Sequence, residues 1–166
     1  FLEIEENQCI SLGDIQVDSM KISHDAAQPV AYRFFGHGKK IAVATDLGMI
    51  TEENEEKLKG MDALLLEANH DVNMLQVGPY PYYLKQRILG NRGHLSNENA
   101  GKLLSRIVHD NLKHIFLGHL SRENNMPALA YEAVRLEITM GENPYKASDF
   151  PIDIAKRSEP SLVVNV

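Results

Sequence analysis

Short apolar runs separated by turn residues fill the first quarter of the chain. Alternating apolar and polar positions such as Ile15 and Val17 are typical of half-buried strands. Turn residues such as Gly13-Asp14 separate one run from the next. The pattern predicts strands over residues 7–11, 14–23 and 29–35.

After residue 40, apolar runs alternate with amphipathic stretches. The runs predict strands over 41–44, 63–66, 114–118 and Leu162–Val164. Capping residues and apolar positions at helical spacing predict helices over Glu52–Glu56, Leu84–Leu89, Ser96–His109 and Pro127–Glu137, with an aromatic loop over Gly78–Tyr83. Strands that alternate with helices indicate an α/β fold. We expect a mixed sheet with helices on one face, whose other face needs a partner.

The composition suits one soluble globular domain. The 166 residues are enough for a core, and 43% of them are hydrophobic. No apolar run approaches the roughly 18 residues that cross a bilayer, so we expect no membrane partner. The only cysteine, Cys9, excludes an internal disulfide and fits the cytoplasm.

The net charge of −6 disfavours a nucleic-acid-binding surface made of clustered Lys and Arg. A metal-dependent nuclease stays open, because bound cations supply a local positive field.

A seven-residue motif occurs twice. Gly93–Asn99 and Gly118–Asn124 share six of seven residues. The second copy begins directly after the apolar run Ile115–Leu117, which predicts a strand, a tight Gly-His turn and a capped helix. His119 then lies at the carboxyl end of a strand, where open α/β sheets bind ligands.

Other polar side chains also follow apolar runs. Asp46 and Glu67 end two of them, His24 follows a third, and His94 precedes a predicted helix. His, Asp and Glu form the ligand set for Zn²⁺, Mn²⁺ or Fe. Asp46 is suited to bridge two metals between His24 and His119.

Structural roles stay open for the same residues. Asp46 alone is equally suited to forming a turn, and Glu67 to accepting backbone hydrogen bonds. We expect His37, His109 and His114 to be structural.

Five segments resemble metallo-β-lactamase-fold hydrolases, and in particular the YycJ/WalJ branch of metal-dependent nucleases or phosphodiesterases. They are Ser23–Tyr32, Ala44–Gly48, Leu66–Asp71 and the two Gly-His-Leu-Ser motifs. The resemblance extends from about Ile10 to Ile138 and, more distantly, to tRNA-processing nucleases. It implies an αββα sandwich with two divalent metal ions, Zn or Mn, or Fe.

The resemblance also implies roles for single residues. His24 matches a ligand of one metal, Asp46 the bridging aspartate, and His119 a ligand of the second metal. Glu67 and His94 match a pair that assists proton transfer to the leaving group. His70 and Asp71 belong to the branch's pattern without an assigned role.

The family's His-x-His-x-Asp-His motif is absent and would lie upstream of Phe1. The resemblance therefore implies that residues 1–166 form the C-terminal portion of a single domain of this fold. We expect this chain alone to bind metal weakly and to be inactive or nearly so. Its missing N-terminal half, or a second copy, is expected to cover the exposed sheet face.

These observations favour a dinuclear hydrolase that cuts phosphodiesters in DNA or RNA. Aromatic and basic side chains near the middle of the chain are candidates for stacking on bases and contacting phosphates: Tyr80, Tyr82, Tyr83, Lys85 and Arg87. A purely structural aromatic loop is an equal alternative. A thioester or lactam hydrolase of the same fold, and a non-catalytic remnant for partner binding or dimerisation, are the other readings.

Overall fold

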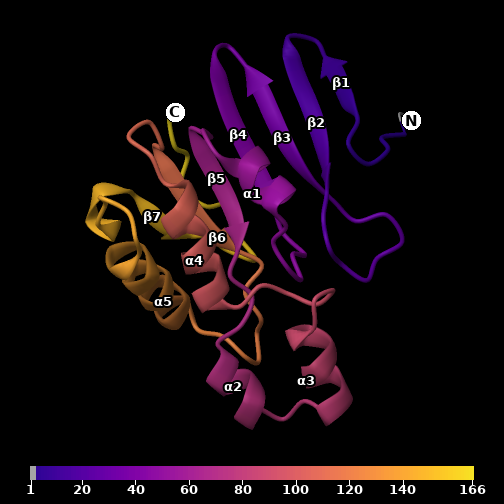
Figure 1. Ribbon diagram of the computed structural model, residues 1–166, viewed down its shortest axis with the longest axis vertical. Helices are drawn as coiled ribbons and strands as arrows, with labels where there is room; N and C mark the ends of the chain where they lie inside the picture. Colours follow the sequence, from indigo (N-terminus) through magenta and orange to yellow (C-terminus); the bar gives the residue numbers. More distant parts are fainter. Residues whose placement is uncertain (1–2) are drawn as a thin grey trace.

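The computed structural model describes residues 3–166, in which a seven-stranded sheet is accompanied by α-helices (Figure 1). The strands are β1 (Cys9–Leu12), β2 (Ile15–Lys21), β3 (Val30–Gly36), β4 (Lys39–Ala44), β5 (Ala63–Glu67), β6 (His114–Gly118) and β7 (Ile152–Ile154). The helices are α1 (Glu52–Leu58), α2 (Val72–Val77), α3 (Tyr82–Leu89), α4 (Asn97–Ile107) and α5 (Pro127–Met140), with a 3₁₀ turn over Ala147–Asp149. No helix within residues 3–166 is long and apolar enough to cross a membrane.

The strands lie in the sheet in the order of the sequence, from β1 to β7. Neighbours from β1 to β4 pair antiparallel, and neighbours from β4 to β7 pair parallel. The predicted strands over 7–11, 14–23, 29–35, 41–44, 63–66 and 114–118 are confirmed to within about two residues at each end.

Helices α1, α4 and α5 cover one face of the sheet (Figure 1). On that face Leu64 and Leu66 are at most 2% exposed and join the core with side chains of α4 and α5. The alternate positions Leu65 and Phe116 point to the other face and are only half-buried, and Ile41 is 36% exposed. The expected mixed sheet with helices on one face is therefore confirmed.

The structure corrects the sequence prediction at several elements. Leu162–Val164 is not a strand, and Val163 is 90% exposed. The last strand is instead β7, which pairs with β6. The short helix α2 was not predicted, and Tyr82 and Tyr83 lie in α3 rather than in a loop. Ser121 does not cap a helix, because α5 begins at Pro127.

The carboxyl ends of β4, β5 and β6 meet at one edge of the sheet. Parallel pairing brings Ala44 beside Leu66 and Glu67 beside Gly118. Helices α2 and α3 lie beyond this edge (Figure 1). Residues that follow these strands are therefore brought together over a small area.

Candidate metal centre

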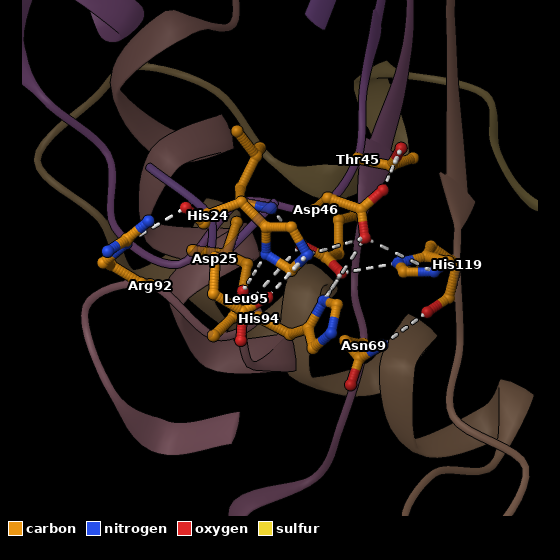
Figure 2. A network of polar contacts seen from close by, with 12 residues as sticks. His24, Asp25, Thr45, Asp46, Asn69, Arg92, His94, Leu95 and His119 are labelled. Carbon is orange, nitrogen blue, oxygen red and sulfur yellow. Dashed lines mark hydrogen bonds and ion pairs between the residues drawn. The ribbon is translucent and has the colours of Figure 1, made fainter. Parts of the chain in front are cut away.

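Asp46, Glu67 and His119 lie at the ends of β4, β5 and β6. Asp46 and His119 have φ angles of 60° and 56°. This left-handed region is uncommon for residues other than glycine, and such backbone often occurs at functional sites. Ligand atoms of Asp46, Glu67, His94 and His119 all lie within 4.8 Å of one another. Figure 2 shows the Asp46, His94 and His119 side chains converging.

His24 approaches the same cluster from the segment after β2 (Figure 2). Its Nδ1 atom lies 3.0 Å from the carbonyl oxygen of Gly93. A carbonyl only accepts, so Nδ1 carries the hydrogen and donates it. The other nitrogen, Nε2, faces two carboxylates and lies 3.5 Å from Asp25 Oδ1 and 3.6 Å from Asp46 Oδ1. With its hydrogen on Nδ1, the ring is in the tautomer that a metal ligand requires.

Glu67 is fully buried and orients two imidazoles at once. Its Oε1 atom accepts from Nδ1 of His94 at 2.8 Å and from Nδ1 of His119 at 2.7 Å. Its Oε2 atom accepts from the backbone N–H groups of Leu47 at 2.6 Å and Leu95 at 3.3 Å. All the accepting positions of the carboxylate are thus engaged within the protein, so Glu67 is suited to orienting the two imidazoles rather than to coordinating an ion.

The hydrogen bonds to Glu67 fix charge as well as geometry. Burial raises the pKa of the Glu67 carboxyl, but the hydrogen bonds from His119 and His94 outweigh it and hold the pKa below its ordinary value. The hydrogen bond to Glu67 in turn raises the pKa of the His119 imidazole. Glu67 is therefore ionised at neutral pH, and the Nε2 atom of His119 lies 3.8 Å from Asp46 Oδ1.

Close backbone contacts hold the loop before His94 against the strand ends. The Ser23 hydroxyl donates to the carbonyl oxygen of Asn91 at 2.7 Å. A Cβ atom at Gly48 would lie 2.3 Å from that same oxygen, and one at Gly93 would lie 2.1 Å from the carbonyl oxygen of Ile88. Only glycine permits these approaches, and they set the position of the histidine that follows Gly93.

The repeated motif is also a structural repeat. His94 and His119 donate to the same oxygen of Glu67. In each copy the serine hydroxyl, of Ser96 or Ser121, accepts at 3.2 Å from the backbone N–H three residues further on. Only Ser96 begins a helix, so the second copy keeps the turn without the helix.

A cleft of about 960 Å³ opens over the cluster. Its lining includes all four of His24, Asp46, His94 and His119. Asp25, which follows the same apolar run as His24, also lines it. Sequence reasoning missed three further lining residues with charged side chains: Arg122, Lys156 and Arg157. For Arg122 a signal was present, because it occupies the one position at which the two motif copies differ.

The five candidates for substrate contacts do not all face this cleft. Tyr80 and Arg87 line it, and Arg87 binds the Asp25 carboxylate. Tyr82 and Tyr83 are 77% and 74% exposed and are not among the lining residues. Lys85 donates to a carbonyl oxygen of α2.

The remaining histidines lie outside the cluster. His37 pairs with Asp14, His109 with a backbone carbonyl, and His114 with Asp153. His70 is 1% exposed, and neither of its ring nitrogens has a hydrogen-bond partner among residues 3–166. Burial lowers the pKa of its imidazole to about 4.

The donor set fits a divalent metal. Two imidazole nitrogens and a carboxylate are the ligands that Zn²⁺, Mn²⁺ and Fe use in hydrolytic sites. Two donors on one tetrahedral ion, each about 2.0 Å from it, lie about 3.3 Å apart. The distances from Asp46 Oδ1 to Nε2 of His24, 3.6 Å, and to Nε2 of His119, 3.8 Å, are slightly larger. Small side-chain movements would therefore bring each pair to the distance that a shared ion requires.

Comparison with known proteins identifies relatives of this chain. The family model described as the beta-lactamase superfamily domain matches residues 2–115. An exodeoxyribonuclease YycJ of Bacillus anthracis is 44% identical over 124 residues, which make up 75% of this chain and 47% of that protein. An exodeoxyribonuclease WalJ of Streptococcus pneumoniae is 43% identical over 121 residues, or 73% of this chain and 45% of that protein. The chain thus spans about half the length of these curated relatives.

A solved structure shares the fold at low sequence identity. Zn²⁺-bound PqqB from Methylobacterium extorquens superposes with a TM-score of 0.63 at 18% identity. The match covers 98% of this chain and 55% of that one.

Proposed function

Because the chain belongs to the β-lactamase superfamily, we propose that its strand-end cluster is part of a dinuclear metal centre that hydrolyses phosphodiester bonds in nucleic acid. One observation carries the proposal: the imidazoles of His24 and His119 both aim an Nε2 atom at Asp46 Oδ1. The names of the exodeoxyribonuclease relatives favour DNA over RNA as the substrate.

His24 and Asp46 would hold one ion, and Asp46 and His119 the second, with Zn or Mn favoured by the donor types and Fe also suited. Such ions supply a Lewis acid for the phosphoryl oxygens and make water acidic enough to attack at neutral pH. The protein keeps its ligands in place beforehand, since Glu67 and the Gly93 carbonyl fix the tautomers of His119 and His24.

His94 is suited to a proton transfer. Its ring lies between those of His24 and His119, with centroid distances of 5.0 Å and 5.2 Å. Glu67 holds Nδ1, which leaves Nε2 as the atom that exchanges a proton. When the P–O bond breaks, the leaving oxygen needs a proton, and an imidazole delivers one near neutral pH. Glu67 and His94 therefore act as a pair.

Three ligands are too few for two ions, so the proposal includes ligands from outside these residues. In this proposal residues 1–166 are the C-terminal portion of one αββα domain. The remaining portion, or a second copy of the chain, supplies further ligands and covers the half-buried side chains of the open sheet face. The cytoplasm remains the proposed location, because Cys9 is exposed and unpaired.

Metal content after dialysis tests the proposal. We expect a form extended upstream, to the length of the relatives, to retain about two ions per chain, and residues 1–166 alone to retain fewer. His24→Asn and His119→Asn in the extended form should each lower the retained metal, whereas His109→Asn should not. Plasma mass spectrometry gives the ratio.

Two outcomes would reject the metal centre. One is the absence of metal from both forms, and the other is equal retention in the His119→Asn and His109→Asn variants. In either case the strand-end histidines are structural, and partner binding becomes the favoured function.

A further inference from the structure

Three basic side chains of the cleft lining come from the segments that follow β6 and β7. Arg122 follows β6, and Lys156 and Arg157 follow β7; all three line the cleft and are exposed. The Arg157 guanidinium donates to the carbonyl oxygen of Leu120, the residue directly after His119. We call Arg122, Lys156 and Arg157 the basic rim; it lies on the His119 side of the candidate metal centre.

The rim carries positive charge that the protein leaves largely uncompensated. Within residues 3–166, neither Arg122 nor Arg157 has a carboxylate within ion-pair distance, and Lys156 pairs only with the exposed Glu159. Arg87, which also lines the cleft, is by contrast bound to Asp25. In a protein with a net charge of −6, free arginines concentrated beside one cleft indicate an anion that binds there.

The repeated motif isolates one member of the rim. At the single position where the two copies differ, the first has Asn97 and the second Arg122. Asn97 is fully buried, and its side chain bonds to Asn125. Arg122 is exposed and lines the cleft. The second copy thus presents a cation to the cleft where the first copy packs an amide.

We propose that the basic rim binds the phosphate next to the one that is cut, on the His119 side of the centre. This inference rests on the proposed function and names the strand contacts of the same site. A guanidinium matches two phosphate oxygens with parallel N–H donors, whereas Lys156 acts as a point charge. Contacts to phosphates do not read bases, so the rim positions a strand of any sequence.

The test is binding of a fluorescently labelled single-stranded DNA to the double variant Arg122→Gln/Arg157→Gln. Anisotropy is measured with EDTA over a range of salt concentrations, in the 166-residue chain and in the extended form. We expect affinity to fall roughly tenfold for each arginine. The slope of log K against log salt should become shallower by about 0.7 for each lost phosphate contact.

Arg135→Gln is the matched control. Arg135 lies on α5 outside the cleft lining and pairs with Glu132, so its removal should leave both affinity and slope unchanged. If the double variant binds with the affinity and slope of Arg135→Gln, the basic rim does not hold the strand.

A second readout separates the rim from the metal centre. Hydrolysis of bis(p-nitrophenyl) phosphate by the metal-loaded extended form does not require a neighbouring phosphate, so it reports on the metal centre alone, and Arg135→Gln should keep it. If the unsubstituted protein fails to hydrolyse this diester, the proposed function fails, whereas the binding measured in EDTA still decides the role of the rim.

Discussion

At the scale of single residues, the buried Glu67 holds the groups of the candidate metal centre in place through its hydrogen bonds. One of its oxygens accepts from two imidazoles and the other from two backbone N–H groups. Asp46 and His119, two of the four non-glycine residues with left-handed backbone among residues 3–166, lie at the ends of the strands on either side of it. A buried carboxylate with four donors is costly to remove, because each donor would lose its partner.

His70 offers a test of burial by pH. Its imidazole takes up a proton near pH 6.5 in the unfolded chain but only near pH 4 in the folded one. Between these values the unfolded state binds more protons, so stability falls as the pH falls, by about 3 kcal/mol in total. In His70→Phe this loss should disappear, and at pH 7 the variant should be at least as stable, because both ring nitrogens lack partners.

Urea unfolding of both proteins from pH 7 to pH 4 measures the difference. Since Glu67 and His119 titrate in both proteins, their contributions largely cancel in the comparison. Parallel stability curves for the two proteins would contradict the assignment of a neutral, buried His70.

At the scale of elements, the loop between α3 and α4 packs closely against the last turn of α3. In Gly93→Ala the added Cβ would meet two backbone carbonyl oxygens, at 2.1 Å and 2.3 Å, so the loop must move. We expect a loss of about 1–3 kcal/mol of stability and a displaced His94 ring. Thermal unfolding and the NMR signals of the histidine ring nitrogens report the two effects.

Gly36→Ala is the control for the loss of a glycine. Its Cβ would lie 3.4 Å from the nearest atom, the Ile15 side chain, so stability and the histidine signals should change little. Unchanged His94 signals in Gly93→Ala would show that the loop does not set the ring position.

The sequence predicted the parts of the fold whose signal is local. Strands β2 to β6 carry their own apolar patterns. The site residues that the structure brings together either follow or end such apolar runs or lie in the repeated motif; they are His24, Asp46, Glu67, His94 and His119. β7 is a strand because it pairs with β6, whereas the more apolar Leu162–Val164 has no such neighbour. Arg122, Lys156 and Arg157 meet only through the sheet order, which no local pattern encodes.

At the scale of the whole molecule, the two faces of the sheet differ in what covers them. Leu66 points to the helices and is 0% exposed, and its neighbour Leu65 points to the open face. Leu66→Ala should lower the free energy of unfolding by about 2–5 kcal/mol in any form of the protein. Leu65→Ala should lower it less in residues 1–166 alone, and as much as Leu66→Ala once a partner covers the open face.

Chemical denaturation of both variants, in the chain and in the extended form, measures this contrast. Equal costs for Leu65→Ala in the two forms would show that the added segment leaves the open face uncovered.

The strictly sequential strand order affects how the sheet can fold during translation. Each strand pairs with the one made just before it, so the sheet can grow at its newest edge as the chain leaves the ribosome. The antiparallel hairpins from β1 to β4 close with short loops and can form early, and the later parallel strands add to a template that already exists. Among residues 3–166 no strand has to be inserted between two others, so the sheet can assemble in the order in which its strands are translated.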